Sequence, residues 1–197
     1  TGSHVLTLPL PLAKAVTKRV FSPDVPVARC VLIACDDDHH QLSALAYPVI
    51  VKPNDEGSSK GIRGRTVLDA PAEVVECCRR LHRDYGCPVL VEEFLPGTEV
   101  TVGVTGNGAR ARVVGLMEVA PAQPEHPFVY SLEVKRDWRQ RVRYHVPPRL
   151  PAATLAALER LALTAYRLLG CRDYARMDFR LDAHQQPRFL ECNALPG

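Results

Sequence analysis

The chain has 197 residues, of which 46% are hydrophobic and 24% charged, and its formal net charge is +3. These values are typical of a globular protein with one sizeable core or two small lobes, and the small net charge excludes a strongly basic nucleic-acid binder. No apolar run is long enough to cross a bilayer, and the seven cysteines include no CxxC pair, which favours free thiols in a reducing cytosol. We therefore expect a cytoplasmic protein without nucleic-acid or membrane partners.

The first half of the chain alternates short helices with apolar strands. β-Branched and other apolar residues predict strands at 27–33, 48–51 and 88–94. Helices are predicted at 13–21, 36–46 and 71–85. The second of these helices begins on an aspartate run, and the third begins on a proline that suits a first helical turn.

The second half combines hairpins with one long helix. Asn107-Gly108 predicts a tight turn between strands 99–105 and 109–119, since this pair accepts positive φ angles. After a proline-rich loop we predict, in order, a strand at 129–134, a helix at 151–169, and a hairpin of strands 174–181 and 188–193. The interleaving of strands, hairpins and helices predicts the α+β class.

The last hairpin carries the strongest local signal for chemistry. Because side chains two apart share one face of a strand, Arg176 and Asp178 point the same way, as do Glu191 and Asn193 on the partner strand. Two carboxylates and a carboxamide on one face suit Mg²⁺, and an arginine beside them could clamp a phosphoryl group. The opposite face is expected to enter the core through Met177, Phe179, Leu190 and Cys192. A solvated polar face is the alternative.

Two further segments could contact a nucleotide. Lys52 ends a buried strand and precedes the loop 53–61, whose glycines and serines can cradle phosphates although it is not a Walker motif. The segment 91–99 ends one strand in two acids and resumes as a strand after a short link. This pattern predicts a hinge whose backbone amides can read an adenine edge. Taken singly, each segment is also compatible with a plain connector.

Taken together and in this order, segments 48–62, 91–101 and 176–197 resemble the three motif regions of the D-alanine–D-alanine ligases within the ATP-grasp superfamily. The ending Glu-x-Asn-x-x-Pro-Gly is specific, and the resemblance extends to 9–27 and 130–147. It implies an ATP-grasp fold, in which two α+β lobes hold the nucleotide in the cleft between them.

The resemblance also implies a domain organisation. A lead-in helix would occupy residues 1–24, a small lobe with the glycine-rich loop 25–95, and a larger catalytic lobe with the magnesium hairpin 96–197. Family members carry an N-terminal domain and a C-terminal tail that are absent here, so we expect the chain to be a piece of a longer protein.

The implied cofactors are ATP and two Mg²⁺ ions, for which Mn²⁺ could substitute. The implied magnesium ligands are Asp178, Glu191 and Asn193. The implied nucleotide contacts are Lys14, Lys52, Glu56, Gly57, Ser58, Ser59, Glu92, Glu93, Phe94, Leu95, Glu99 and Lys135. Among them, the resemblance assigns Lys14 and Lys52 to phosphates, Glu92 and the Leu95 backbone to adenine, and Glu99 to ribose. The implied catalytic groups are Arg176, Lys135, Ser59 and the backbone N–H of Gly197.

The implied reaction joins two small molecules, a carboxylate and an amine, with amino acids as the expected substrates. The carboxylate attacks the γ-phosphorus to give an acyl phosphate and ADP, and the amine then displaces phosphate to form a peptide or amide bond. A homodimer is compatible with the resemblance. Two alternatives stay open: a nucleotide-binding module without catalysis, and a ligase with a hydroxyl acceptor.

The sequence departs from the family pattern at several positions. Ala13 stands where an aspartate is usual, and Arg136 stands where many D-alanine ligases place a tyrosine that closes over the substrate. Lys60, Ser131 and Leu132 also differ from the usual residues. These departures predict preserved nucleotide chemistry with an altered acceptor side.

Overall fold

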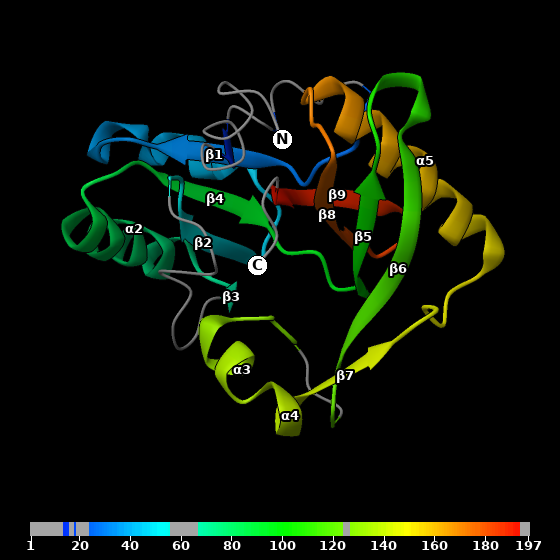
Figure 1. The fold of residues 1–197 in the computed structure, drawn as a ribbon. Coiled ribbons are helices and arrows are strands. Elements are labelled where there is room, and N and C mark those ends of the chain that lie inside the picture. Colours follow the sequence, from blue (N-terminus) through cyan, green and yellow to red (C-terminus); the bar gives the residue numbers. More distant parts are fainter. Residues whose placement is uncertain (1–13, 16–17, 19–23, 56–66, 124–126, 194–197) are drawn as a thin grey trace.

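Two antiparallel sheets organise the chain (Figure 1). The computed structural model describes residues 14–15, 18, 24–55, 67–123 and 127–193. Figure 1 shows the two sheets between helices α2 (Pro71–Tyr85) and α5 (Ala152–Leu168), which lie at opposite ends of the molecule. Two sheets with helices packed on them confirm the predicted α+β class. No helix in the described ranges has both the length and the apolar character that a membrane span requires.

The smaller sheet has four strands in the order β1-β4-β2-β3. Its strands are β1 (Cys30–Ile33), β2 (Val49–Pro53), β3 (Val67–Leu68) and β4 (Val89–Glu93). The helix α2, which has the predicted bounds, packs against β2 and β3, and the helix predicted after the aspartates is a 3-10 helix, η1 (Asp36–Ala44). Val49, Val74, Leu81, Val89 and Val91 are among the buried residues that join these elements into one apolar core.

The larger sheet has five strands in the order β7-β6-β5-β8-β9. Its strands are β5 (Glu99–Thr105), β6 (Arg112–Pro121), β7 (Val142–His145), β8 (Tyr174–Leu181) and β9 (Pro187–Asn193). The helix α5 covers one face of this sheet and buries Leu158, Ala162 and Tyr166 against it. The opposite face of β5, β8 and β9 is therefore the one that can carry polar side chains toward the smaller sheet.

Two predicted local structures are wrong. The segment predicted as a strand at 129–134 instead leads into the helix α3 (Leu132–Arg136), because the Ser131 hydroxyl accepts a hydrogen bond from the Val134 N–H at 3.3 Å and caps it. Asn107 and Gly108 do not form the predicted tight turn either. Asn107 is extended, exchanges hydrogen bonds with Asp173 and precedes a short 3-10 helix, η2 (Gly108–Arg110).

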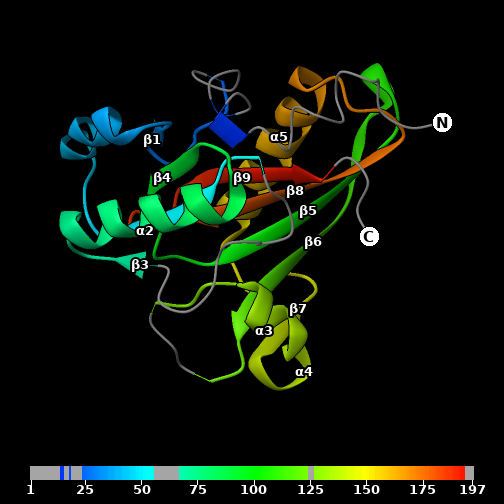
Figure 2. The same ribbon diagram turned by 90° about the vertical axis from the view of Figure 1, so that its left-hand side faces the viewer.

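A segment from 94 to 98 crosses from the smaller sheet to the larger one. Its end is fixed on β8, since the Gly97 N–H donates to the Leu181 carbonyl at 3.0 Å and the Leu181 N–H donates to the Thr98 carbonyl at 3.0 Å. A Cβ atom on Gly97 would lie 2.6 Å from the Leu181 carbonyl oxygen, which is closer than real Cβ atoms approach. Figures 1 and 2 both show α3 and α4 (Trp138–Arg141) below the two sheets.

A β-bulge corrects the predicted core face of the last hairpin. Asp178 pairs with Glu191, but Phe179 pairs with Phe189, so the register shifts between these pairs and Leu190 is the extra residue. Phe189 is therefore fully buried and packs edge-on against Phe179 at 5.6 Å between ring centroids, whereas Leu190 is only partly buried. Met177, Phe179 and Cys192 are buried as predicted.

We expect Phe189→Ala to lower the free energy of unfolding by about 3–5 kcal/mol, because it leaves a cavity between β9 and α5. Leu190→Ala is the matched control and should cost less than about 2 kcal/mol, since its side chain loses less buried area. Urea unfolding followed by circular dichroism measures both. A larger loss for Leu190→Ala would show that the strict alternation, and not the bulge, describes β9.

Candidate active site

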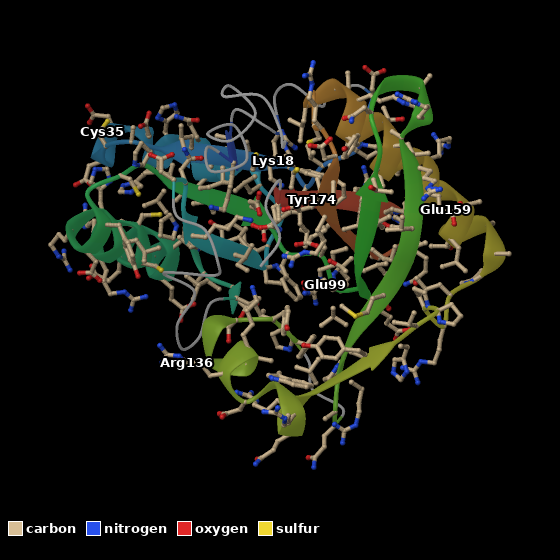
Figure 3. The ribbon with its side chains drawn as sticks, viewed as in Figure 1. Lys18, Cys35, Glu99, Arg136, Glu159 and Tyr174 are labelled. Carbon is tan, nitrogen blue, oxygen red and sulfur yellow. The ribbon has the colours of Figure 1, made fainter. Side chains whose placement is uncertain are left out.

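The polar face of the larger sheet gathers the residues of the last hairpin. On β8 and β9, Arg176 lies opposite Asn193 and Asp178 lies opposite Glu191. On the other side of β8, Asp178 lies opposite Thr101 of β5. The sequence prediction that the four hairpin residues share one face and lie side by side is confirmed. Figure 3 shows Glu99 of β5 between the two sheets, near the middle of the molecule.

Asp178 is the centre of this face. Its carboxylate accepts two hydrogen bonds from the Arg176 guanidinium, at 2.9 and 3.0 Å, and one from the Asn193 amide at 3.0 Å. The Thr101 hydroxyl also donates to it. Burial, with Glu191 nearby, raises the pKa of Asp178 against the opposing effects of Arg176 and Thr101. Two neighbouring carboxylates disfavour each other's ionised form, and Arg176 offsets part of that cost.

The smaller sheet presents a second buried charge cluster. Glu92 of β4 is 1% exposed, and its two carboxylate oxygens lie 2.6 Å from the Lys18 ammonium and 2.5 Å from the Lys52 ammonium. Burial alone would raise the pKa of Glu92, but the two lysines outweigh it and hold that pKa at about 2. Glu92 is therefore a permanent anion at neutral pH that fixes both ammonium groups.

Lys14 lies beside this cluster. Its ammonium donates to the carbonyl oxygens of Pro53 and Asn54 at 3.3 Å each, and the Asn54 side chain accepts from the Ala15 N–H at 3.0 Å. Burial and the charge of Lys52 lower the pKa of Lys14 to about 8. A bound anion would relieve this electrostatic cost, because it would add negative charge beside two neighbouring ammonium groups.

The two charge clusters face each other. Glu191 of the larger sheet acts electrostatically on Lys14 and Lys52 of the smaller one and raises the pKa of both. The smaller sheet therefore contributes ammonium groups to this region, and the larger sheet contributes carboxylates beside the Arg176 and Arg180 guanidinium groups. A ligand that carries both phosphate groups and divalent cations would complement the two sets of groups at once.

The crossing segment joins the two sheets at one end. Glu93 accepts a hydrogen bond from the Ala46 N–H at 2.8 Å, the Phe94 N–H donates to the Pro48 carbonyl at 2.9 Å, and Leu95 is buried. Glu99 follows at the start of β5 and lies 3.4 Å from Arg180. Lys135 of α3 lies over the Tyr130 ring, with 4.9 Å between its ammonium and the ring centroid.

The donor set of the hairpin fits a magnesium ion. Among the described residues no group of three or more His, Cys, Asp and Glu side chains is placed to hold a metal ion. Asn193 donates its NH₂ group to Asp178, so its amide oxygen is the atom that could add to the two carboxylates as a ligand. Hard oxygen ligands, few in number, suit Mg²⁺ that is shared with phosphates.

Some predicted site residues lie outside the described ranges, namely Glu56, Gly57, Ser58, Ser59 and Gly197. Sequence reasoning also missed Lys18, Thr101 and Arg180 as parts of this site. The two strand residues share the alternating face of Asp178, so the same spacing argument applies to them. Arg136, by contrast, is exposed at the edge of the molecule (Figure 3).

We expect Glu92→Gln to lower the free energy of unfolding by about 3–5 kcal/mol at pH 7, because it leaves two buried ammonium groups without a counter-charge. Glu76→Gln is the control: Glu76 and Arg83 lie 4.0 Å apart on the exposed side of α2, and this change should cost less than about 1 kcal/mol.

The same substitution has a defined pH dependence. The folded pKa of Glu92 is depressed from 4.5 to about 2, so its contribution is complete above about pH 4.5 and is lost as the pH falls toward 2. The difference between the wild type and Glu92→Gln should therefore shrink in urea unfolding curves taken from pH 5 down to pH 3. A constant difference would contradict the ion cluster.

Solved structures with known activities share this fold. A D-alanine–D-alanine ligase from Bacillus anthracis complexed with ATP superposes with a TM-score of 0.76 at 20% identity, over 100% of this chain and 59% of that one. The VanG D-Ala:D-Ser ligase from Enterococcus faecalis gives a TM-score of 0.79 at 22% identity, over 100% of this chain and 56% of that one. These similarities show the predicted ATP-grasp fold.

Sequence relatives agree with the structural comparison. D-alanine–D-alanine ligases from Methylibium petroleiphilum and Polaromonas naphthalenivorans are each 36% identical over 204 residues, which cover 100% of this chain but 61% and 60% of the relatives. The chain thus spans about three fifths of the curated relatives' length. A family model described as the D-ala D-ala ligase C-terminus matches residues 24–197. Because that model covers most of the sequence, the chain belongs to the D-alanine–D-alanine ligase C-terminal family.

Proposed function

We propose that this chain is the ATP-binding and catalytic part of a ligase that joins a carboxylate to an amine through an acyl phosphate. One observation carries the proposal: Lys14 and Lys52 of the smaller sheet lie within electrostatic reach of Glu191, which is paired with Asp178 in the last hairpin. This pairing of charges suits a triphosphate with its divalent cations, and the named activity of the sequence relatives supports the same reaction.

The phosphate side of the proposal depends on the lysines. Lys52 is fixed by Glu92, and Lys14 is fixed by the carbonyl oxygens that follow β2, so both can present their charge to phosphate oxygens without rearrangement. Lys135 is assigned to the γ-phosphate, and residues Glu56 to Ser59 to a loop that closes over the phosphates. Closure of such a loop would exclude water from the acyl phosphate.

The metal side depends on the hairpin. Asp178, Glu191 and the Asn193 oxygen would hold Mg²⁺, which when bound neutralises charge on the transferring phosphoryl group. We propose two Mg²⁺ ions, with Mn²⁺ as an acceptable substitute, because both ions prefer oxygen ligands. Arg176 is already oriented by its two hydrogen bonds to Asp178, so its guanidinium can stabilise negative charge near the acyl centre. The Gly197 N–H and Ser59 are assigned to the same task.

The nucleoside side depends on the crossing segment. The Glu92 to Leu95 backbone and side chains are assigned to adenine, and Glu99 to the ribose hydroxyls. Each Glu92 oxygen already contacts one ammonium group, so adenine would share this carboxylate with Lys18 and Lys52. The division into a small lobe at 25–95 and a large lobe at 96–197 stays a prediction, although Val25 packs in the core of the larger sheet.

The substrates and setting of the reaction are part of the proposal. We assign amino acids as substrates, since D-alanine appears in the relatives' names. A cytoplasmic location is supported by the seven free cysteines. We still predict that the protein has no nucleic-acid or membrane partner, and a homodimer also remains a prediction.

We expect the chain to bind ATP only weakly without Mg²⁺, and Glu191→Gln to weaken Mg²⁺-dependent binding about tenfold or more, because it removes one charge from the ligand set. Isothermal titration calorimetry with and without Mg²⁺ measures these affinities, with GTP as the comparison nucleotide. Glu159→Gln, an exposed change on α5 far from the site (Figure 3), is the control and should bind ATP like the wild type. Equal binding by the wild type and Glu191→Gln would remove the hairpin from the metal site.

Turnover separates the proposal from its alternatives. Supplied with ATP, Mg²⁺ and D-alanine or other amino acids, the protein should release ADP and phosphate, and Glu191→Gln should abolish that release. Mass spectrometry of the products identifies the bond. Tight ATP binding without any ADP release would indicate a binding module, and an ester formed from a hydroxy acid would indicate a hydroxyl acceptor.

A further inference from the structure

Arg180 is a buried cation in the cleft to which the proposed function assigns no role. It follows Arg176 and Asp178 on the same face of β8, at the end of the strand nearest the crossing segment. It is 7% exposed, although arginine is seldom buried unless it is paired. Arg180 lies opposite Glu99, to which the proposed function assigns the ribose, and Arg176 lies four residues farther from that end of β8.

Three separate segments hold the Arg180 guanidinium. One nitrogen lies 3.4 Å from the Glu99 carboxylate, and another donates to the Phe128 carbonyl at 2.6 Å. The guanidinium carbon also lies 5.0 Å from the centre of the Phe94 ring, which belongs to the crossing segment. A planar cation stacked on an aromatic ring and hydrogen-bonded at its edge has a fixed orientation. The buried Nε–H has no acceptor among the described residues.

We propose that Arg180 is a positioning residue for the sugar of the nucleotide, which keeps the Glu99 side chain ionised, aimed into the cleft and aligned with Phe94. This inference rests on the proposed function, because it concerns how the nucleoside end of that site recognises ribose. An ionised carboxylate accepts hydrogen bonds from both sugar hydroxyls, whereas a protonated one gives up part of that capacity. Arg180 would therefore act on the sugar through Glu99.

The surroundings of Glu99 explain why it needs a cation. Burial, with Asp178 and Glu191 nearby, raises the pKa of Glu99 to about 7, and Arg180 and Lys135 already hold it below the value that burial would otherwise give. The Tyr130 hydroxyl is a further titratable group that interacts with Glu99. Without Arg180, the remaining groups would favour a protonated Glu99 at neutral pH.

The test compares two nucleotides in the complete 197-residue chain. ATP·Mg and 2′,3′-dideoxy-ATP·Mg are titrated into the wild type, Arg180→Met and Arg180→Lys by calorimetry. Arg180→Met should weaken the binding of ATP about tenfold at pH 7.5. The reason is that Glu99 would then be protonated and would no longer accept a charged hydrogen bond from the sugar. It should change the affinity for the dideoxy nucleotide less than about threefold, since that nucleotide lacks the hydroxyls. Arg180→Lys retains the charge and should restore part of the ATP affinity.

Two further measurements separate a positioning role from a structural one. The ATP affinity lost in Arg180→Met should return as the pH rises toward 9, because Glu99 then ionises without help. Adding Glu99→Gln to Arg180→Met should weaken ATP little further, since both changes act on the same contact. Arg188→Met, which breaks an ion pair with Asp182 in the same hairpin, controls for altered folding and should bind both nucleotides normally.

The outcomes distinguish this inference from the proposed function. Equal losses for ATP and the dideoxy nucleotide, or an ATP loss that does not change with pH, would overturn the role of Arg180. Unchanged ATP affinity in Arg180→Met would also overturn the role of Arg180. In each of these cases, binding of ATP by the wild type would leave the proposed function in place. A wild type that binds neither nucleotide would instead overturn the proposed function.

Discussion

The need to compensate buried charge constrains this molecule more than any other requirement. Glu92, between Lys18 and Lys52, and Asp178, between Arg176 and Asn193, are each almost removed from water. Charges in such places are stable only with partners at contact distance, so each sheet fixes its own charged side chains before any ligand arrives. The cationic and anionic groups then remain complementary to a ligand of mixed charge, and this arrangement is the physical basis of the proposed reaction.

In the larger sheet, the pairing register of the strands brings each buried charge next to its partners. A strand places alternate residues on one face, and the pairing of β8 with both β5 and β9 brings three polar rows together. A shift by one residue in either pairing would turn Asp178 away from Thr101 or Glu191. The bulge at Leu190 affects only the part of β9 before Glu191, where it turns Phe189 into the core without disturbing the polar rows.

The sequence alone predicted the features that depend on local periodicity. The hairpin face of Arg176, Asp178, Glu191 and Asn193 followed from alternation, and helix α2 followed from the proline at its start. The bulge at Leu190 was missed because an inserted residue leaves no mark in an alternating pattern.

Long-range pairing was also beyond sequence reasoning. Lys18 and Glu92 are far apart in the sequence and meet only in the folded chain, so neither local sequence predicts their ion pair. The strand predicted at 129–134 failed because the apolar residues suggested an extended chain, whereas the Ser131 cap starts a helix. Predictions for Glu56 to Ser59 and for Gly197 lie outside the described residues.

The close approach of Gly97 to Leu181 has a mechanical consequence. Because the two backbones are hydrogen-bonded at contact distance, the last part of the crossing segment moves together with β8 as one rigid piece. Any rotation of the smaller sheet against the larger one must therefore be absorbed before Gly97, between Phe94 and Pro96. That pivot includes Phe94, whose ring lies under the Arg180 guanidinium, so a rotation between the sheets would first change the contact between these two side chains.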